Sequence, residues 1–414
     1  MLSEDYLIEQ LNAPTRQERL MAVTGLKKLM DDGFLEKPLQ GEDINNHIHT
    51  TYSFSPYSPS KAVWRAYTAG LCTAGIMDHD SIGGAEEFIE AGKIVGLPTT
   101  IGMEMRVDFS NTPLNGRRIN NPDQDSIAYM AVHGIPHTQI SRAAEFMQDS
   151  RDKRNIRNAR MVEGINARFG GDGLELDFEL DVKPLSLSHL GGSVTERHLL
   201  YALAKKINNM GIALSDSLRG YLLDVSNPFY EYDLLGALKS DLSSIYIDAD
   251  EECLDVRRVI EFADSIGAIS AYAYLGESVT GDKRAQAFED SYLEQLFEVI
   301  SELGFKAVTY MPSRNTAEQL ERLRALCEKY SLFQISGEDI NSPRQLFICK
   351  ALQNPAYHNL VDSTWALIGH ELAATKDKEL GMFSQSSVKK YGTLASRTEF
   401  FGKLGRNPEL IEQL

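Results

Sequence analysis

Apolar strands and amphipathic helices alternate along the chain from about residue 41, and polar residues follow the ends of several strands. Asp78-His79-Asp80 follows an early apolar run, and Ser336-Gly337-Glu338-Asp339 follows the last one. When covering helices separate parallel strands, the carboxyl ends of the strands lie on one face and the loops there converge. The alternation predicts an α/β fold of parallel strands with its chemistry at one end. The predicted strands are 46–50, 72–77, 98–103, 126–132, 268–274, 305–310 and 332–335.

A His-x-His pair, His47 and His49, lies in the first of these strands. Side chains alternate along an extended backbone, so both imidazoles project to the same side, where one metal ion can bind both. Taken alone the pair is a weak signal. It is equally compatible with one buried structural histidine and one solvent-facing histidine.

Composition narrows the classes of partner. Asp and Glu (59) outnumber Lys and Arg (42), which gives a formal net charge of −17. Nucleic-acid binding and docking on anionic membranes both favour a basic surface, so we expect neither. A small anionic substrate remains compatible, because a bound metal ion reverses the local field. The four cysteines are widely spaced and the start of the chain has no apolar segment, which predicts a cytoplasmic protein.

Laid end to end, the strand-end motifs resemble those of the PHP superfamily, the polymerase and histidinol phosphatase metal-dependent phosphoesterases. The resemblance covers about residues 41–345. It rests on His47-Ile48-His49-Thr50-Thr51, Gly75-Ile76-Met77-Asp78-His79-Asp80-Ser81, Gly102-Met103-Glu104-Met105, Val194-Thr195-Glu196-Arg197-His198-Leu199 and Ser336-Gly337-Glu338-Asp339. It implies a distorted (β/α)7 barrel of the PHP type with an inserted helical subdomain.

The resemblance also implies a metal cluster of one to three divalent ions, with zinc, manganese or iron as candidates. All ligands of the first ion are present: His47, His49, Glu104 and Asp339. The second ion shares Glu104, but its two further histidine positions align with Ala128 and Tyr274, and His133 is a possible replacement. At the third ion's positions, Phe54 or Ser55, His79 and Asn341, only His79 is a good donor. One ion is therefore the best-supported number.

Further roles follow from the same resemblance. His79 or His198 is expected to act as general acid or to contact the phosphate. Asp78 is either a ligand or the carboxylate that orients a ligand histidine, and Tyr274 is expected to donate a hydrogen bond into the site. Arg314 and Arg197 are the expected phosphate-binding guanidinium groups, since arginine binds phosphate through paired hydrogen bonds.

The predicted organisation has four parts. They are an N-terminal helical extension (1–40), the barrel (41–345), a helical insertion within it (139–235), and a C-terminal extension packed on the barrel (346–414). The insertion carries a basic run, Arg151, Lys153, Arg154, Arg157, Arg160 and Arg168. This run is either a solvated helix face or an electropositive lid over a phosphate site.

Two functions remain open at this point. The first is a phosphatase-type hydrolase that cleaves a small phosphomonoester or nucleotide phosphate by attack of metal-bound hydroxide. The second is a PHP-derived domain that binds a phosphorylated ligand without turnover, which the replacements at Ala128, Tyr274 and Asn341 favour. A weaker third possibility is C–N bond hydrolysis, as in the distantly similar amidohydrolases. A homo-oligomer is compatible with each.

Overall fold

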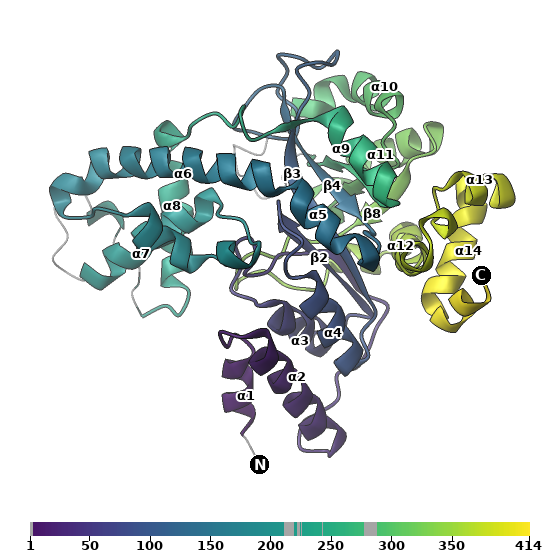
Figure 1. Ribbon diagram of the computed structural model, residues 1–414, viewed down its shortest axis with the longest axis horizontal. Helices are drawn as coiled ribbons and strands as arrows, with labels where there is room; N and C mark the ends of the chain where they lie inside the picture. The colour runs from purple at the N-terminus through teal and green to yellow at the C-terminus, as the bar shows by residue number, and fades with distance from the viewer. Residues whose placement is uncertain (1–2, 211–218, 222–223, 225, 242, 277–287) are drawn as a thin grey trace.

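A single mixed sheet curls into a nearly closed barrel at the centre of the molecule (Figure 1). The computed structural model describes residues 3–210, 219–221, 224, 226–241, 243–276 and 288–414. Within them the strand order is β1-β2-β3-β4-β6-β7-β8, and the two-residue strand β5 pairs with β3. The strands are β1 Ile44–Ile48, β2 Thr73–His79, β3 Thr99–Asp108, β4 Ile127–His133, β5 Leu254–Asp255, β6 Ile269–Tyr274, β7 Ala307–Tyr310 and β8 Phe333–Ser336.

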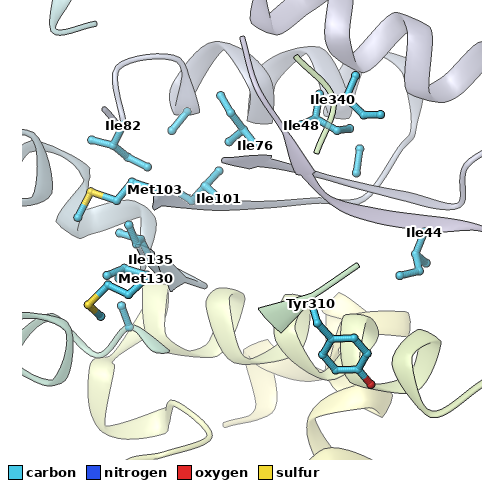
Figure 2. Close-up of a cluster of buried hydrophobic side chains, with 14 of the residues drawn as sticks. Ile44, Ile48, Ile76, Ile82, Ile101, Met103, Met130, Ile135, Tyr310 and Ile340 are labelled. Atoms are coloured by element: carbon cyan, nitrogen blue, oxygen red, sulfur yellow. The ribbon is translucent and has the colours of Figure 1, made fainter. Parts of the chain in front are cut away.

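The barrel closes between its first strand and the segment after its last one. Ile48 and Ile340 form an isolated parallel bridge, in which the His49 amide donates to the Ile340 carbonyl at 3.0 Å. The Ile340 amide donates in turn to the His47 carbonyl at 3.1 Å. Figure 2 places Ile48 beside Ile340 in the buried apolar layer outside the strands. This closure brings the start and end of the barrel together at the predicted ligands.

The expectation of parallel strands is wrong for one of them. β4 runs antiparallel to both β3 and β6, whereas the other pairs along the barrel are parallel. No helix lies between β3 and β4, which a looping segment joins, and the Phe109 amide donates to the Ser126 carbonyl at 2.8 Å. Parallel neighbours need a long crossover, usually a helix, so a direct return gives an antiparallel pair. This reversal is the distortion of the barrel.

Helices cover the outside of the barrel. α3 (Pro59–Thr68) and α4 (Ala85–Val95) pack near the first strands, with α9 (Val256–Ile266), α10 (Leu293–Leu303) and α11 (Ala317–Lys329) near the later ones. The N-terminal helices α1 (Glu4–Gln10) and α2 (Arg16–Asp31) pack on each other and against α3 and α4. Side chains alternate along each strand, so Ile101 and Met103 face the helices while Glu104 and Arg106 face the inside.

α12 (His358–Lys376) closes the amino-terminal end of the barrel, where it packs against β8, β3 and β1. The Asn46 side chain donates to Thr364 Oγ1 at 2.7 Å. The buried Glu371 carboxylate accepts from Thr100 Oγ1 at 2.6 Å and from the Ile101 amide at 2.8 Å. α13 (Gln385–Tyr391) and α14 (Leu394–Arg406) follow, and α14 packs on α12. The functional end is therefore the opposite, carboxyl-terminal one.

Four helices lie between β4 and β5: α5 (Ile140–Phe146), α6 (Gln148–Phe169), α7 (Glu196–Met210) and α8 (Tyr230–Asp241). Of these, α6, α7 and α8 project from the barrel at the left of Figure 1, whereas α5 stays near the centre of the molecule. α6, α7 and α8 share a hydrophobic core of their own, with residues such as Ile165, Leu203 and Leu234. Residues 211–218, 222–223 and 225 of the predicted insertion lie outside the described part of the chain. Among the described helices, none combines the length and the apolar character needed to cross a bilayer.

Candidate metal centre

Five side chains converge at the carboxyl-terminal end of the barrel: His47, His49, His79, Glu104 and Asp339. His49 Nε2 lies 3.1 Å from Asp339 Oδ1, and His47 Nε2 lies 3.5 Å from Glu104 Oε2. His79 Nδ1 lies 3.2 Å from the same Glu104 oxygen. The ligand atoms form two groups of three within 4.8 Å of one another, one around Asp339 and one around Glu104. The structure thus brings together the residues that the sequence predicted as metal ligands.

Each of these side chains is placed by the ladder of the barrel. His79 ends β2 directly opposite Glu104 of β3, which fixes their side chains on the same inward face. Asp339 comes three residues after β8, beyond Gly337. A Cβ at Gly337 would lie 2.6 Å from the Cβ of His47, so only glycine lets these two segments approach so closely.

The electrostatics favour the metal-binding forms of Glu104, Asp339 and His79, whereas, despite burial, Glu104 and Asp339 raise the pKa of His47. Burial opposes ionisation of Glu104, yet the neighbouring imidazoles of His79 and His47 hold its pKa at about 2. Burial acts the same way on Asp339, and His49 nevertheless lowers the pKa of this carboxyl group well below its usual range. Burial lowers the pKa of His79 to about 3, which keeps this imidazole neutral. Carboxylates and neutral imidazoles are the forms that bind divalent ions.

These residues fit a bound divalent ion. His47 Nε2 and His49 Nε2 are buried and have no hydrogen-bond partner, and both face the two carboxylates. Buried polar atoms without partners are uncommon, and a ligand that binds them is one explanation. Two imidazoles and two carboxylates are a set that zinc, manganese and iron all accept.

Asp78 supports this cluster without joining it. Its carboxylate accepts from the Thr50 amide and the Thr50 hydroxyl, both at 2.6 Å, and from Ser53 Oγ at 2.7 Å. Ser53 Oγ also lies 3.3 Å from His49 Nδ1. Of the two roles that the sequence left open for Asp78, the geometry matches the orientation of a ligand histidine.

The strand positions aligned with the second ion do not face the site. Ala128 is the partner of Val107 and packs in the outer core, whereas the next residue, Tyr129, lines the cavity. The Tyr274 hydroxyl donates to Asp290 at 2.6 Å, so the expected hydrogen bond from Tyr274 into the site is wrong. The antiparallel course of β4 shifts which residue points inward, and Tyr274 lies on the outer face of β6.

His133 and His198 are also placed away from the cluster. His133 is the partner of Gly102, two residues before Glu104, and so lies deeper toward the floor of the barrel. His198 is buried against Phe54, and its Nδ1 accepts from the Thr195 amide at 3.0 Å. Neither histidine belongs to the metal-type groups or lines the cavity beside the cluster, which gives no support to His198 as general acid. His133 keeps one feature of a ligand, because its Nε2 is buried without a hydrogen-bond partner and, besides burial, the charges of His47 and Glu104 act on its pKa.

Two of the expected phosphate-binding residues, Arg197 and Arg314, line the same cavity as the cluster. Arg197 Nη1 donates to Asn341 Oδ1 at 2.7 Å, and Asn341 Nδ2 donates to Asp339 at 2.5 Å. Asn341 therefore links the guanidinium group to a predicted metal ligand. Arg314 Nε is buried without a hydrogen-bond partner. Within the described residues, neither arginine forms an ion pair within 4 Å.

The interpretation of the basic run as a solvated face is wrong for Arg151, Arg154 and Arg157, each of which is buried. Arg154 Nε donates to Glu252 at 2.9 Å, and Arg157 Nε donates to the same carboxylate at 2.7 Å. The network also includes Arg106, Glu196 and Asp80, so its three central guanidinium groups meet three carboxylates. Because its charges balance, the network links α6 to the barrel and is not a free anion-binding site.

A cavity of about 590 Å³ extends from the cluster to the projecting helices. Its walls include Asp80 and Arg154, and also two residues that sequence reasoning missed, Tyr129 and Arg106. The alternation of β3 gives a signal for Arg106, which lies two residues after Glu104 and therefore on the same face.

Comparison with known proteins agrees with this fold. No family model matches the chain. A 5'-3' exoribonuclease of Haemophilus influenzae is 36% identical over 126 residues, which are 30% of this chain and 45% of the relative. The chain thus matches less than half the length of this curated relative.

Solved structures match over more of the chain. A protein from Bifidobacterium adolescentis, proposed to be a metal-dependent phosphoesterase, aligns with a TM-score of 0.53 at 20% identity, over 77% of this chain and 96% of that one. An amidohydrolase from Chromobacterium violaceum, solved with sulfate and no metal, aligns with a TM-score of 0.50 at 16% identity, over 74% and 90%. These likenesses show the fold, a distorted and nearly closed barrel with additional helices.

Proposed function

We propose that this chain is a metal-dependent phosphoesterase that hydrolyses a small phosphomonoester. The observation that carries the proposal is that one cavity holds both a metal-type cluster and two guanidinium groups without carboxylate partners among the described residues. The cluster suits a divalent ion, and the guanidinium groups suit a phosphoryl group. The similarity of fold to a proposed phosphoesterase supports the same class.

In this proposal His47, His49, Glu104 and Asp339 hold the ion. A bound divalent ion lowers the pKa of water and stabilises charge on phosphoryl oxygens. Arg197 and Arg314, which line the same cavity, bind and orient the phosphoryl group. Asn341 ties Arg197 to Asp339, so that the phosphate-binding group and the ligand keep a fixed spacing. His79 is neutral, and it acts as a ligand or a hydrogen-bond donor rather than as an imidazolium acid.

Turnover of a panel of phosphomonoesters with added zinc, manganese or iron tests the proposal. We expect Asp339→Asn to lower kcat/KM by more than about 100-fold, because even the outer partners of metal ligands are worth about 10–100-fold. Asp123→Asn, which changes a carboxylate in the same cavity but outside the cluster, is the matched control and should keep most activity. Equal activity in both variants would contradict the proposal.

A second candidate is binding of a phosphorylated ligand without turnover. The positions Ala131 and Ala273 on β4 and β6 carry no imidazole, so within the described residues two histidines and two carboxylates form a four-residue ligand set for one ion. A single ion clamps the attacking and leaving oxygens less well than a pair. Metal and phosphate binding without hydrolysis of any ester in the panel would favour this candidate.

The partial match to an exoribonuclease makes the end of a short RNA another candidate substrate for the same site. The net charge of −17 favours a small substrate over an extended polyanion. A 5'-phosphorylated oligoribonucleotide therefore belongs in the panel, with less turnover expected than for the small esters.

A further inference from the structure

The cavity beside the metal-type cluster is much larger than an ion and a phosphoryl group need. Its volume of about 590 Å³ lies within the roughly 300–1,000 Å³ of sites that enclose whole small molecules. The cluster, Arg197 and Arg314 occupy part of its wall. The remaining wall must therefore face whatever the phosphoryl group is attached to.

That remaining wall is mixed: charged and polar residues such as Arg106 and Glu196 line part of it, and one continuous apolar part comes from the projecting helices. Met161 and Ile165 on α6, Leu199 and Leu200 on α7, and Ile245 in the short helix η8 (Ser243–Ile245) all line the cavity. The first four have at most 8% of their surface exposed, and all five belong to or pack against the core of the helical group. Packing holds these side chains in place; Met161, Leu200 and the half-buried Ile245 present most of the apolar surface, and Ile165 and Leu199, each 1% exposed, support it from behind.

The buried ion-pair network keeps this wall at a fixed position above the cluster. Arg106 on β3 and Arg154 on α6 both donate to Glu252, and Arg157 bonds the same carboxylate. Because these charges are paired with one another, they do not compete for the substrate's phosphate. The network holds the apolar wall at one end and leaves the phosphate site to Arg197 and Arg314 at the other.

We propose that the apolar wall formed by Met161, Ile165, Leu199, Leu200 and Ile245 is a specificity pocket for a compact, uncharged apolar group, aryl or branched alkyl, on the phosphoryl-bearing ligand. This inference rests on the proposed function for the position of the phosphoryl group. Removal of such a group from water against a preformed apolar wall favours binding in proportion to the area buried. A ligand with a polar or charged group at that end leaves this surface without a partner.

Calorimetric binding of two unreactive phosphonates tests the pocket without any need for turnover. Benzylphosphonate and methylphosphonate share the phosphonate group and differ in the apolar group. We expect the wild-type chain, with and without added zinc, to bind benzylphosphonate at least about tenfold more tightly, since differences in pocket filling are worth about 10–200-fold. Met161→Gln keeps a similar volume and Ile245→Thr is smaller by one heavy atom; both make the wall polar and should remove most of this preference.

The matched control is Ile156→Thr, the same chemical change at an exposed residue of α6 outside the cavity. It should retain the preference, and the thermal midpoints of all variants check that they fold. Equal binding of the two phosphonates by the wild-type chain, or no measurable binding of either, would overturn the inference, as would a preference that survives both cavity variants. A preference that disappears as expected, in a chain that hydrolyses no phosphomonoester, would uphold the pocket and refute the proposed turnover.

Discussion

At the scale of single residues, a carboxylate one layer behind the cluster determines how His49 is oriented. Asp78 takes three hydrogen bonds from Thr50 and Ser53, and Ser53 contacts His49 Nδ1. Such a chain fixes the ring and directs Nε2 toward the carboxylate of Asp339. Outer partners of this kind commonly tune metal affinity as strongly as geometry does.

Asp78→Asn tests this role. The amide places donors against donors, so we expect a loss of about 1–3 kcal/mol in the free energy of unfolding and about 10–100-fold in metal affinity, measured by chemical denaturation and chelator competition. Ser53→Ala removes the contact to His49 but leaves Asp78 bonded to Thr50. It should weaken metal binding with a smaller loss of stability, and unchanged metal affinity in both variants would contradict the role.

The shifted pKa of a second buried carboxyl group, that of Glu289, makes the stability of the fold depend on pH. Burial raises the pKa of Glu289 to about 7, while its carboxylate accepts from the amides of Leu275 and Gly276 at 2.8 and 3.0 Å. The folded state therefore holds this proton more tightly than the unfolded chain, whose ordinary glutamate pKa is 4.5. The resulting stabilisation is complete below the unfolded pKa and is lost as the pH rises through about 7.

Between pH 4.5 and 7, we expect this carboxyl group to lower the free energy of unfolding of the wild type by about 1–3 kcal/mol, and the Glu289→Gln variant to lack this decrease. Urea denaturation at several pH values measures it. Glu298→Gln, at an exposed position on α10, is the control and should leave the pH profile of the wild type unchanged. Parallel profiles for wild type and Glu289→Gln would refute the assignment.

The residue scale also shows where sequence reasoning succeeds. The family resemblance implied His47, His49, Glu104 and Asp339 as ligands, and the structure brings these four side chains together; strand alternation explains only the common direction of His47 and His49. The sequence did not predict that Tyr129 lines the cavity. Which residues of β4 face inward depends on the register of the strand, and a shift of one residue turns every side chain to the other face.

At the scale of elements, the buried arginines of α6 fasten the helical group to the barrel. From the sequence alone, one interpretation was that these arginines form a solvated helix face, because arginine is rarely buried without a partner. Their partners, Glu252 and Glu196, lie about forty to one hundred positions further along the chain, as the separations of 39 and 95 residues for Arg157 show. No local pattern indicates pairing at such distances.

Glu252→Gln tests the fastening. The change leaves three buried guanidinium groups with one fewer charged partner, and we expect a loss of about 3–5 kcal/mol in unfolding free energy. Glu251→Gln removes a neighbouring carboxylate that is exposed and should change stability by less than about 0.5 kcal/mol. Equal effects in the two variants would show that the network contributes little.

At the scale of the whole molecule, the C-terminal helices complete the barrel. α12 closes its amino-terminal end, and α14 packs tightly on α12 through glycines. A Cβ at Gly405 would lie 2.0 Å from the Trp365 carbonyl oxygen, and one at Gly369 would lie 1.9 Å from that of Phe401. The sequence indicated helical packing in this region but not where the helices lie. The role of the glycines, close approach of two helix backbones, can be recognised only when both helices are seen together.

Gly405→Ala is expected to separate these helices and to lower the unfolding free energy by at least about 1–3 kcal/mol, as measured by thermal or urea denaturation. Gly402→Ala, on the same helix, has its nearest atoms at 3.7 Å and should be neutral or stabilising, because alanine favours helix by about 1 kcal/mol over glycine. A stable Gly405→Ala protein would argue against this close packing.

The central claim concerns the whole barrel, since it requires that residues from its first, third and last strands hold one ion. Anomalous X-ray diffraction from crystals grown with zinc tests it most directly. We expect one strong peak at about 2.0–2.2 Å from His47 Nε2, His49 Nε2 and oxygens of Glu104 and Asp339. A strong peak elsewhere, or none among these four side chains, would contradict the claim.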